Sequence, residues 1–183
     1  KDSICLVEAG GNGKNLFIKM PAGNGFIFGN PKFDWGYHSV KQAQLNNRKI
    51  YFARGKGLGG TSIVNGMVYI RGVAQDYDNW RQMGLDGWGY SDLLPYFKYS
   101  EGSTNRQNNF HGNQGPLKVE PARNFSLLDK AFIKAAVETG HEFLDDFNAN
   151  KRAGVSRIDS TTYRGVRQSS AISYLKKVPK NLK

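Results

Sequence analysis

A glycine-rich stretch just before residue 60 constrains this chain more than any other feature. Residues 54–72 read RGKGLGGTSIVNGMVYIRG, and four of the six residues from Gly55 to Gly60 are glycine. Glycine lacks a Cβ and adopts positive φ readily, so such a run lets the backbone turn tightly and approach a bulky ligand. Consecutive amide groups that lead into a helix can face a pyrophosphate or an electron-rich ring. The stretch therefore predicts a ligand-binding loop.

Polar side chains follow the glycines. Thr61 and Ser62 can donate hydroxyl hydrogen bonds, and Asn65 lies within a mostly apolar run. A buried amide without partners would cost about 1–3 kcal/mol, so we expect Asn65 to be hydrogen-bonded. The spacing of Lys56 does not match the Gly-x-x-x-x-Gly-Lys-Ser/Thr loop, which argues against nucleoside triphosphate hydrolysis.

The composition indicates a folded, strongly basic chain. Its 183 residues allow one large domain or two small ones, and 39% hydrophobic with 13% aromatic residues exclude disorder along the whole length. Lys and Arg number 26 against 15 Asp and Glu, a formal charge of +11. Along the sequence the cations look scattered, apart from a C-terminal group at Lys176, Lys177, Lys180 and Lys183. No nucleic-acid-binding motif accompanies them, so we interpret them mainly as a solvated surface, in part as a complement to an anionic ligand.

The compartment is only weakly indicated. The single cysteine, Cys5, excludes an internal disulfide and fits a reducing compartment. No run approaches the roughly 18 apolar residues of a membrane span, and residues 1–9 are too short and polar for a signal peptide. The chain does not begin with Met, which suggests a partial chain. We expect a cytoplasmic protein or one peripheral to the inner membrane face.

Apolar patterns and turn residues predict the following elements. Strands are expected at 4–7, with Cys5 buried in it, and at 48–53, 117–120 and 155–162. Helices are expected at 73–83, at 90–99 with Ser91 as cap, at 127–140 with Ser126 as cap, and at 169–177. Residues 61–71 suit a helix or a helix plus an extended arm, 13–47 suit loops and short extended pieces, and 101–114 suit a linker or surface loop. Trp80 and Trp88 are expected in core or domain-interface packing.

Glu8 follows the first predicted strand. An acidic residue at the tip of a strand holds ribose hydroxyls in dinucleotide-binding folds, although a Glu in this position is more often a solvated strand end. The glycine fingerprint that should lie roughly 20 residues upstream cannot be present, because only seven residues precede Glu8.

Taken together, Glu8-Ala9-Gly10 and residues 54–72 resemble the glucose–methanol–choline family of flavin oxidoreductases, especially its choline dehydrogenase and aliphatic alcohol dehydrogenase branch. The resemblance covers nearly the whole chain. It continues through Asp76-Tyr77-Asp78-Asn79-Trp80, Trp88-Gly89-Tyr90, Leu94-Pro95-Tyr96-Phe97-Lys98, His111-Gly112, Gly115-Pro116-Leu117 and Arg167-Gln168-Ser169-Ser170-Ala171.

The resemblance implies an α/β fold, in parts α+β: a partial FAD-binding, Rossmann-like domain at 1–100 that lacks the first strand and glycine fingerprint. The start of a substrate-binding domain would follow at 101–165, and 166–183 would return toward the FAD domain. Glu8 would bind the adenosine ribose. The remaining predicted cofactor contacts are Gly55, Gly59, Gly60 and Thr61 near the pyrophosphate and flavin, and Asn65, Gly66, Met67 and Val68 along the isoalloxazine. Arg54, Lys56 or Arg71 could balance phosphate charge.

The implied reaction is oxidation of a primary alcohol, choline-like, aliphatic or aromatic, to an aldehyde by hydride transfer to FAD. Members that bind flavin covalently carry a His where this chain has Val64, so FAD should be non-covalent. No catalytic residue is assigned, because the family's catalytic His belongs to a C-terminal part expected to be missing, and the fragment alone should be inactive. His38 and His141 are expected to be structural or solvated, as is His111, in a surface loop.

Several alternatives remain open. A family oxidase or a hydroxynitrile lyase would share the same glycine-rich block, and the electron acceptor cannot be read from these residues. A basic nucleic-acid-binding module is a more distant alternative. We expect a small-molecule alcohol as the partner, with neither nucleic acid nor a transmembrane segment.

Overall fold

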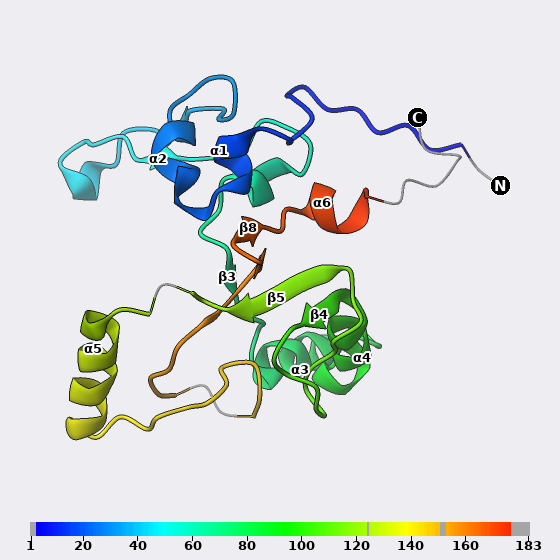
Figure 1. Cartoon of the computed structure of the whole chain (residues 1–183), viewed down its shortest axis with the longest axis vertical. Coiled ribbons are helices and arrows are strands. Elements are labelled where there is room, and N and C mark those ends of the chain that lie inside the picture. Colours follow the sequence, from blue (N-terminus) through cyan, green and yellow to red (C-terminus); the bar gives the residue numbers. More distant parts are fainter. Residues whose placement is uncertain (1–2, 124, 151–152, 177–183) are drawn as a thin grey trace. The chain divides into compact units, whose positions relative to one another are not determined.

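The computed structural model describes residues 3–123, 125–150 and 153–176. They fall into two compact units, one comprising Lys1–Met67 with Tyr163–Lys183 and the other Val68–Thr162 (Figure 1). We call these the outer-segment unit and the central unit. The predicted assignment of 1–100, 101–165 and 166–183 to functional domains stays a prediction. Of the predicted C-terminal lysine group, only Lys176 lies within the described residues.

The outer-segment unit is built from short elements around a small core. They are α1 (Leu16–Lys19), η1 (Pro21–Gly23), α2 (Asn24–Ile27), β1 (Tyr37–His38), η2 (Ala43–Leu45), β2 (Tyr51–Phe52), η3 (Gly60–Ile63), β8 (Val166–Arg167) and α6 (Ser170–Tyr174). The core comprises Ile18, Ile27, Phe33, Ile63 and Val64. The glycine-rich loop therefore contributes its own apolar side chains to the core that supports it.

The prediction of loops and short extended pieces at 13–47 is confirmed in part, by β1 and the loops around it, but it missed the helical turns at α1, η1 and α2. The Asn15 side chain caps α1 by accepting a hydrogen bond from the Phe17 amide, and Ile18 and Ile27 are buried. A four-residue helix is too short to show a hydrophobic period in the sequence. Its stability comes from tertiary packing, so the sequence pattern does not predict it.

The predicted buried strand at 4–7 is wrong. Residues 4–7 form none of the structure's strand elements, Val7 is 87% exposed, and Cys5 is exposed. A short apolar run becomes a buried strand only where neighbouring strands satisfy its backbone and cover its side chains. The expectation for 48–53 is confirmed in part, because β2 pairs antiparallel with β1.

Asp34 anchors the chain around β2. This buried carboxylate accepts hydrogen bonds from the amides of Gly29, Gly36 and Arg54 and from the Tyr51 hydroxyl. Burial alone would raise the pKa of Asp34, but these hydrogen bonds lower it to about 2. The last residue before the glycine-rich loop is thereby held by a buried anion.

The central unit contains a four-stranded mixed sheet and three longer helices. Its elements are β3 (Val68–Tyr69), α3 (Ala74–Gln82), α4 (Tyr90–Ser100), β4 (Glu101–Ser103), β5 (Leu117–Pro121), α5 (Leu127–Glu138) and β6 (Asp159–Ser160). The strand order is β3-β6-β5-β4; β4 and β5 are parallel, with Glu101 opposite Leu117, and the other pairs are antiparallel. The chain passes from the central to the outer-segment unit within β7 (Thr162–Tyr163), which pairs with β8. The predicted mixture of helices and strands is confirmed.

The predicted helices are confirmed with changes at their ends. The Ser126 side chain caps α5 by accepting from the Asp129 amide, as predicted. The N-cap of α4 is Gly89 rather than Ser91. The Asp92 carboxylate, in the first turn of the helix, accepts a hydrogen bond from the Gly89 amide at 3.1 Å. Ser169 caps α6, which is shorter than predicted.

The central unit leaves many apolar side chains exposed. Neither α3, α4 nor α5 contains a buried residue, and Phe132 on α5 is 70% exposed. Trp80 and Trp88, predicted in core or domain-interface packing, are 41% and 50% exposed, so they are not in the core, and their rings meet edge to face. Among the described residues no helix has the length and apolar character needed to cross a membrane.

The prediction of a linker or surface loop at 101–114 is confirmed in part: residues 104–110 are mostly exposed and lie outside helices and strands, but the segment is not a linker. It begins with β4, and both Glu101 and His111 are almost fully buried. Glu101 and His111 can be buried because they pair with each other and with Arg71 and Asp146 of the same unit. The strand predicted at 155–162 is found only at β6 and the start of β7.

Candidate functional site

The glycines of the loop at 55–60 are required by close backbone packing and by backbone conformation. A Cβ on Gly55 would lie 2.3 Å from the Gly60 carbonyl oxygen, and Gly59 has φ +105. The loop also bonds to the segment after Glu8, since the Leu58 amide donates to the Gly11 carbonyl at 2.8 Å. The fold thus brings together the two motifs that the sequence separates by more than forty residues.

Parts of this loop remain open to a ligand. A Cβ on Gly60 or Gly66 would meet nothing within 4 Å. Among the described residues, the amides of Gly59, Thr61 and Gly66 donate to no protein acceptor. Free amide donors on a rigid, glycine-rich backbone are suited to anionic oxygens or to the edge of a ring.

Glu8 presents an exposed carboxylate beside the loop. Its Oε1 atom accepts a hydrogen bond from the Gly10 amide at 2.7 Å, and the residue is exposed. A Cβ on Gly10 would lie 2.4 Å from the Gly57 nitrogen, so the Glu8 turn packs directly on the loop. The carboxylate keeps acceptor capacity that a hydroxyl group could use.

Asn65 and Met67 form the far end of the loop. Met67 adopts the left-handed conformation with φ +62 and is 9% exposed. The Asn65 side-chain oxygen accepts from the Met67 amide at 3.1 Å. The expectation that Asn65 is hydrogen-bonded is confirmed, although the residue is exposed rather than buried. A non-glycine residue at positive φ stores about 1–3 kcal/mol of strain, and such residues cluster at ligand sites.

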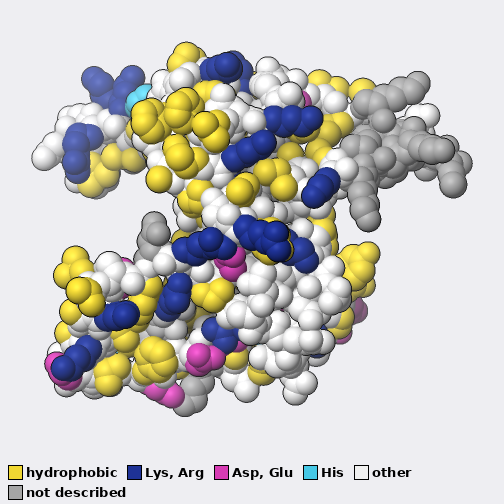
Figure 2. Space-filling view, viewed as in Figure 1, with side chains coloured by type: hydrophobic (Ala, Val, Ile, Leu, Met, Phe, Trp, Pro, Cys, Tyr) yellow, Lys and Arg dark blue, Asp and Glu magenta, His cyan; other side chains and the backbone are white. Residues whose placement is uncertain are grey.

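The formal charge is not scattered between the units, contrary to expectation. The outer-segment unit has 15 of the 26 Lys and Arg residues but only three of the 15 Asp and Glu, which makes its formal charge +12 and that of the central unit −1. Figure 2 shows Lys and Arg side chains spread over the viewed face with few acidic ones. Such a field favours a multiply charged anion at the loop.

The three basic residues considered for phosphate differ in availability. Arg54 is exposed, and Lys56 lies over the Trp35 ring with its Nζ atom 5.0 Å from the centroid. Arg71 lies in the central unit, where it is 7% exposed and pairs with Glu101 at 2.8 Å. We therefore withdraw Arg71 as a phosphate ligand.

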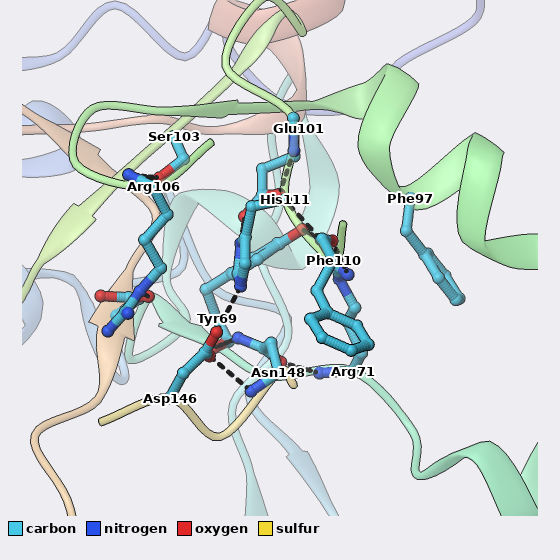
Figure 3. A network of polar contacts seen from close by, with 12 residues as sticks. Tyr69, Arg71, Phe97, Glu101, Ser103, Arg106, Phe110, His111, Asp146 and Asn148 are labelled. Carbon is cyan, nitrogen blue, oxygen red and sulfur yellow. Dashed lines mark hydrogen bonds and ion pairs between the residues drawn. The ribbon is translucent and has the colours of Figure 1, made fainter. Parts of the chain in front are cut away.

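A buried network occupies the central unit around His111 (Figure 3). The His111 Nδ1 atom is 2.8 Å from a Glu101 carboxylate oxygen, and Nε2 is 2.7 Å from an Asp146 oxygen. Both ring nitrogens can donate only in the imidazolium form. Burial alone would lower the pKa of His111, but its hydrogen bonds with Asp146 and Glu101 raise it to about 9. His111 is thus a buried cation and not a surface-loop residue, which corrects the prediction.

Neighbouring residues complete this network. Arg71 donates to Glu101 and to the Phe110 carbonyl at 2.7 Å, and its backbone amide donates to the Asn148 side chain at 2.9 Å. Because every carboxylate in the group already faces a cation, the network joins four chain segments and leaves no base free for proton transfer. His38 and His141 are exposed and stay without an assigned role.

One buried residue near the loop was not singled out by sequence reasoning. Arg167 is 0% exposed and donates to both oxygens of Asn65 at 2.6 and 2.8 Å. The only sequence signal was its place in the stretch Arg167-Gln168-Ser169-Ser170-Ala171, which carried part of the resemblance. Arg167 and Asn65 are 102 residues apart in the sequence, so no local pattern predicts their contact.

Comparison with known proteins identifies the family. Residues 5–182 match the GMC oxidoreductase family, and the chain belongs to that family. The resemblance seen in the loop and in the flanking motifs is thereby confirmed.

Among its relatives are oxygen-dependent choline dehydrogenases. The one from Sinorhizobium fredii is 42% identical over 176 residues, which are 96% of this chain and 32% of that protein. The one from Brucella anthropi is 38% identical over 174 residues, 95% of this chain and 32% of that protein. The chain thus spans about a third of the length of the curated relatives it matches.

Solved structures agree with this assignment. Pyridoxine 4-oxidase from Mesorbium loti superposes with a TM-score of 0.92 at 32% identity, covering 100% of this chain and 37% of that one. An FAD-dependent oxidoreductase from Chaetomium thermophilum has a TM-score of 0.86 at 28% identity, covering 98% of this chain and 33% of that one. The predicted α/β class, related to FAD-binding domains, is confirmed.

Proposed function

We propose that this chain is the cofactor-contacting part of an FAD-dependent dehydrogenase that oxidises a primary alcohol, choline or a similar small molecule, to an aldehyde. The observation that carries the proposal is the 42% identity to a choline dehydrogenase over 96% of the chain. The whole of the glycine-rich loop lies within the family match. The likeness to structures of an alcohol-type oxidase and an FAD-dependent oxidoreductase supports the same chemistry.

The loop fits FAD in three respects. The glycines leave room at Gly60 and Gly66, the amides of Gly59 and Thr61 are free to donate, and the +12 unit complements a dianionic pyrophosphate. Glu8 would hold ribose hydroxyls, and the residues from Asn65 to Val68 would border the isoalloxazine. When bound, FAD would supply the hydride-accepting chemistry that alcohol oxidation requires.

We propose further that the cofactor is held without a covalent bond. Val64 occupies the position of the linking His in covalent members, and its side chain is 1% exposed and part of the apolar core. An alkyl side chain has no atom that could attack the flavin. We assign no catalytic base to the described residues, because the only buried imidazole, His111, is held between two carboxylates.

The proposal is tested by spectroscopy on the purified chain and on any longer polypeptide that contains it. We expect flavin absorption between roughly 350 and 500 nm, and bleaching on anaerobic addition of choline or a primary alcohol to the longer protein. Flavin released by denaturation would support non-covalent binding. A folded longer protein that binds no flavin would refute the proposal.

Glu8→Gln tests the ribose contact. Loss of a charged hydrogen-bond acceptor should raise the dissociation constant for FAD about tenfold. Glu138→Gln is a matched control, because Glu138 is an exposed carboxylate of the central unit paired with Lys134 at 3.7 Å. Equal effects of the two substitutions on FAD binding would contradict the assignment of Glu8.

An oxidase is the alternative with a specific observation in its favour, the 0.92 superposition on pyridoxine 4-oxidase. The two differ in what reoxidises the flavin. Oxygen consumption and peroxide formation at the rate of alcohol oxidation would favour the oxidase, whereas turnover that needs an added acceptor would favour the dehydrogenase.

A further inference from the structure

Arg167 is a buried cation that lacks a negatively charged partner. The residue is 0% exposed, and its hydrogen bonds go to neutral oxygens: the carbonyls of Ile18 at 2.9 Å and Ser62 at 3.5 Å, both oxygens of Asn65, and the side chain of Asn24 at 2.8 Å. Within the described part of the chain it forms no ion pair. Arg71, by contrast, is neutralised by Glu101.

Keeping such a charge is energetically unfavourable. Burial lowers the pKa of Arg167 to about 10, which still leaves the guanidinium charged at neutral pH. A neutral side chain could satisfy several of the same oxygens with a smaller desolvation cost. Hydrogen bonding alone therefore does not explain why this position holds a charged side chain, whereas a role that needs the charge itself would explain it.

The contacts of Arg167 lead directly to the strained end of the loop. One oxygen, Asn65 Oδ1, accepts from the Arg167 Nη1 atom at 2.8 Å and from the Met67 amide at 3.1 Å. Because Met67 is at φ +62, its backbone needs an external constraint. Arg167 orients the side chain that supplies it.

The residues that follow Arg167 hold the other end of the same loop. The Ser170 amide donates to the Ser62 hydroxyl at 2.9 Å, and the Ser170 hydroxyl donates to the Gly59 carbonyl at 3.0 Å. Residues 167–170 therefore clamp the loop at Gly59 and at Asn65. The cation is located at the end that our proposed function places beside the isoalloxazine.

We propose that Arg167 is a positioning residue for the flavin-contacting end of this loop: it orients Asn65, maintains the left-handed backbone at Met67, and places a fixed positive charge behind them that favours a reduced, more negative flavin. This inference rests on the proposed function. It makes two separable claims. The contacts of three guanidinium nitrogens with Ile18, Asn24 and Asn65 act on cofactor affinity, and the charge acts on the reduction potential.

The test compares Arg167→Gln and Arg167→Lys with the unaltered protein, in the longest polypeptide that binds FAD. Arg167→Gln should weaken FAD binding about tenfold or more, because charged hydrogen bonds are lost, and should make the reduction potential of the bound flavin more negative. Arg167→Lys retains the charge, but one ammonium group cannot replace the three guanidinium nitrogens that contact Ile18, Asn24 and Asn65. The potential should therefore stay near that of the unaltered protein while affinity falls.

A double-mutant cycle tests whether Arg167 acts through Asn65. Asn65→Ala alone should also weaken FAD binding, and the double variant should bind no worse than Asn65→Ala, because Arg167 is proposed to act through Asn65. Fully additive losses would overturn the route through Asn65. Since Asn65 is exposed, its variant should fold even if Arg167→Gln does not, and unchanged FAD affinity in Asn65→Ala would then overturn the proposal.

Arg106→Gln is the control for loss of a partly buried, ion-paired arginine. Arg106 is paired with Asp145 and Asp159 in the central unit, so its variant should lose stability but keep the affinity and potential of the flavin. A purely structural Arg167 would give this same pattern, which would overturn the proposal. A folded, unaltered protein that binds no FAD would refute the proposed function, and this inference with it, before any variant is compared.

Discussion

Replacing His111 should change how the stability of the central unit depends on pH. The pKa of this histidine rises from 6.5 to about 9 in the folded protein. Each pKa unit is worth about 1.36 kcal/mol, so the charged form contributes about 3 kcal/mol to stability. A raised folded-state pKa stabilises fully below the unfolded value of 6.5, and this contribution is lost as the pH rises through 9.

The perturbation is His111→Gln, which keeps a polar side chain of similar size but cannot carry the charge. Near pH 6 the variant should be less stable than the unaltered protein by about 3 kcal/mol more than near pH 9.5. In this variant Glu101 retains its contacts with Arg71 and the Gly112 amide. Asp146 loses its positively charged partner, so it is the carboxylate that is destabilised most. The comparison isolates His111 because all other titrating groups are shared.

The assay is urea unfolding followed by tryptophan fluorescence. Trp80 and Trp88 lie in the central unit and Trp35 in the other, so a Trp35→Phe background reports on the central unit alone. Both proteins are measured at several pH values between about 6 and 9.5. A stability difference that stays constant across this range would refute a charged His111.

Two further predictions concern the outer-segment unit. Gly55→Ala should lower the free energy of unfolding by about 1–3 kcal/mol, because the new Cβ would lie 2.3 Å from the Gly60 oxygen. Gly66→Ala is the control and should lower it far less, because a Cβ there meets nothing within 4 Å. Equal losses of stability in thermal melts would contradict the packing argument. Asp34→Asn should cost about 1–2 kcal/mol near neutral pH. Because the folded pKa of Asp34 is lowered from 3.8 to about 2, its contribution is present above pH 3.8 and disappears as the pH falls through 2; acid unfolding curves that coincide for the two proteins would show that the carboxylate is not stabilised.

Local sequence rules succeeded where the determining contacts are close along the chain. The Ser126 cap and Asp129 lie three residues apart, and the glycines at 55–60 have few alternatives to a tight loop. The same rules failed at 4–7 and, in part, at 101–114. An apolar tetrapeptide becomes a buried strand only if neighbours cover it, and a polar segment can be buried if its charges find partners.

The sequence by itself determined the family, the ligand-binding character of the glycine-rich loop and the mixed helix and strand content, because these follow from short motifs and from periodicity. Only the tertiary structure decided that His111 is a buried cation, that the positive charge belongs to one unit, and that Arg167 bonds to Asn65. These features depend on residues 10 to 102 positions apart. A local pattern cannot specify such pairs, because burial and charge compensation are set by whichever distant segments the fold brings into contact.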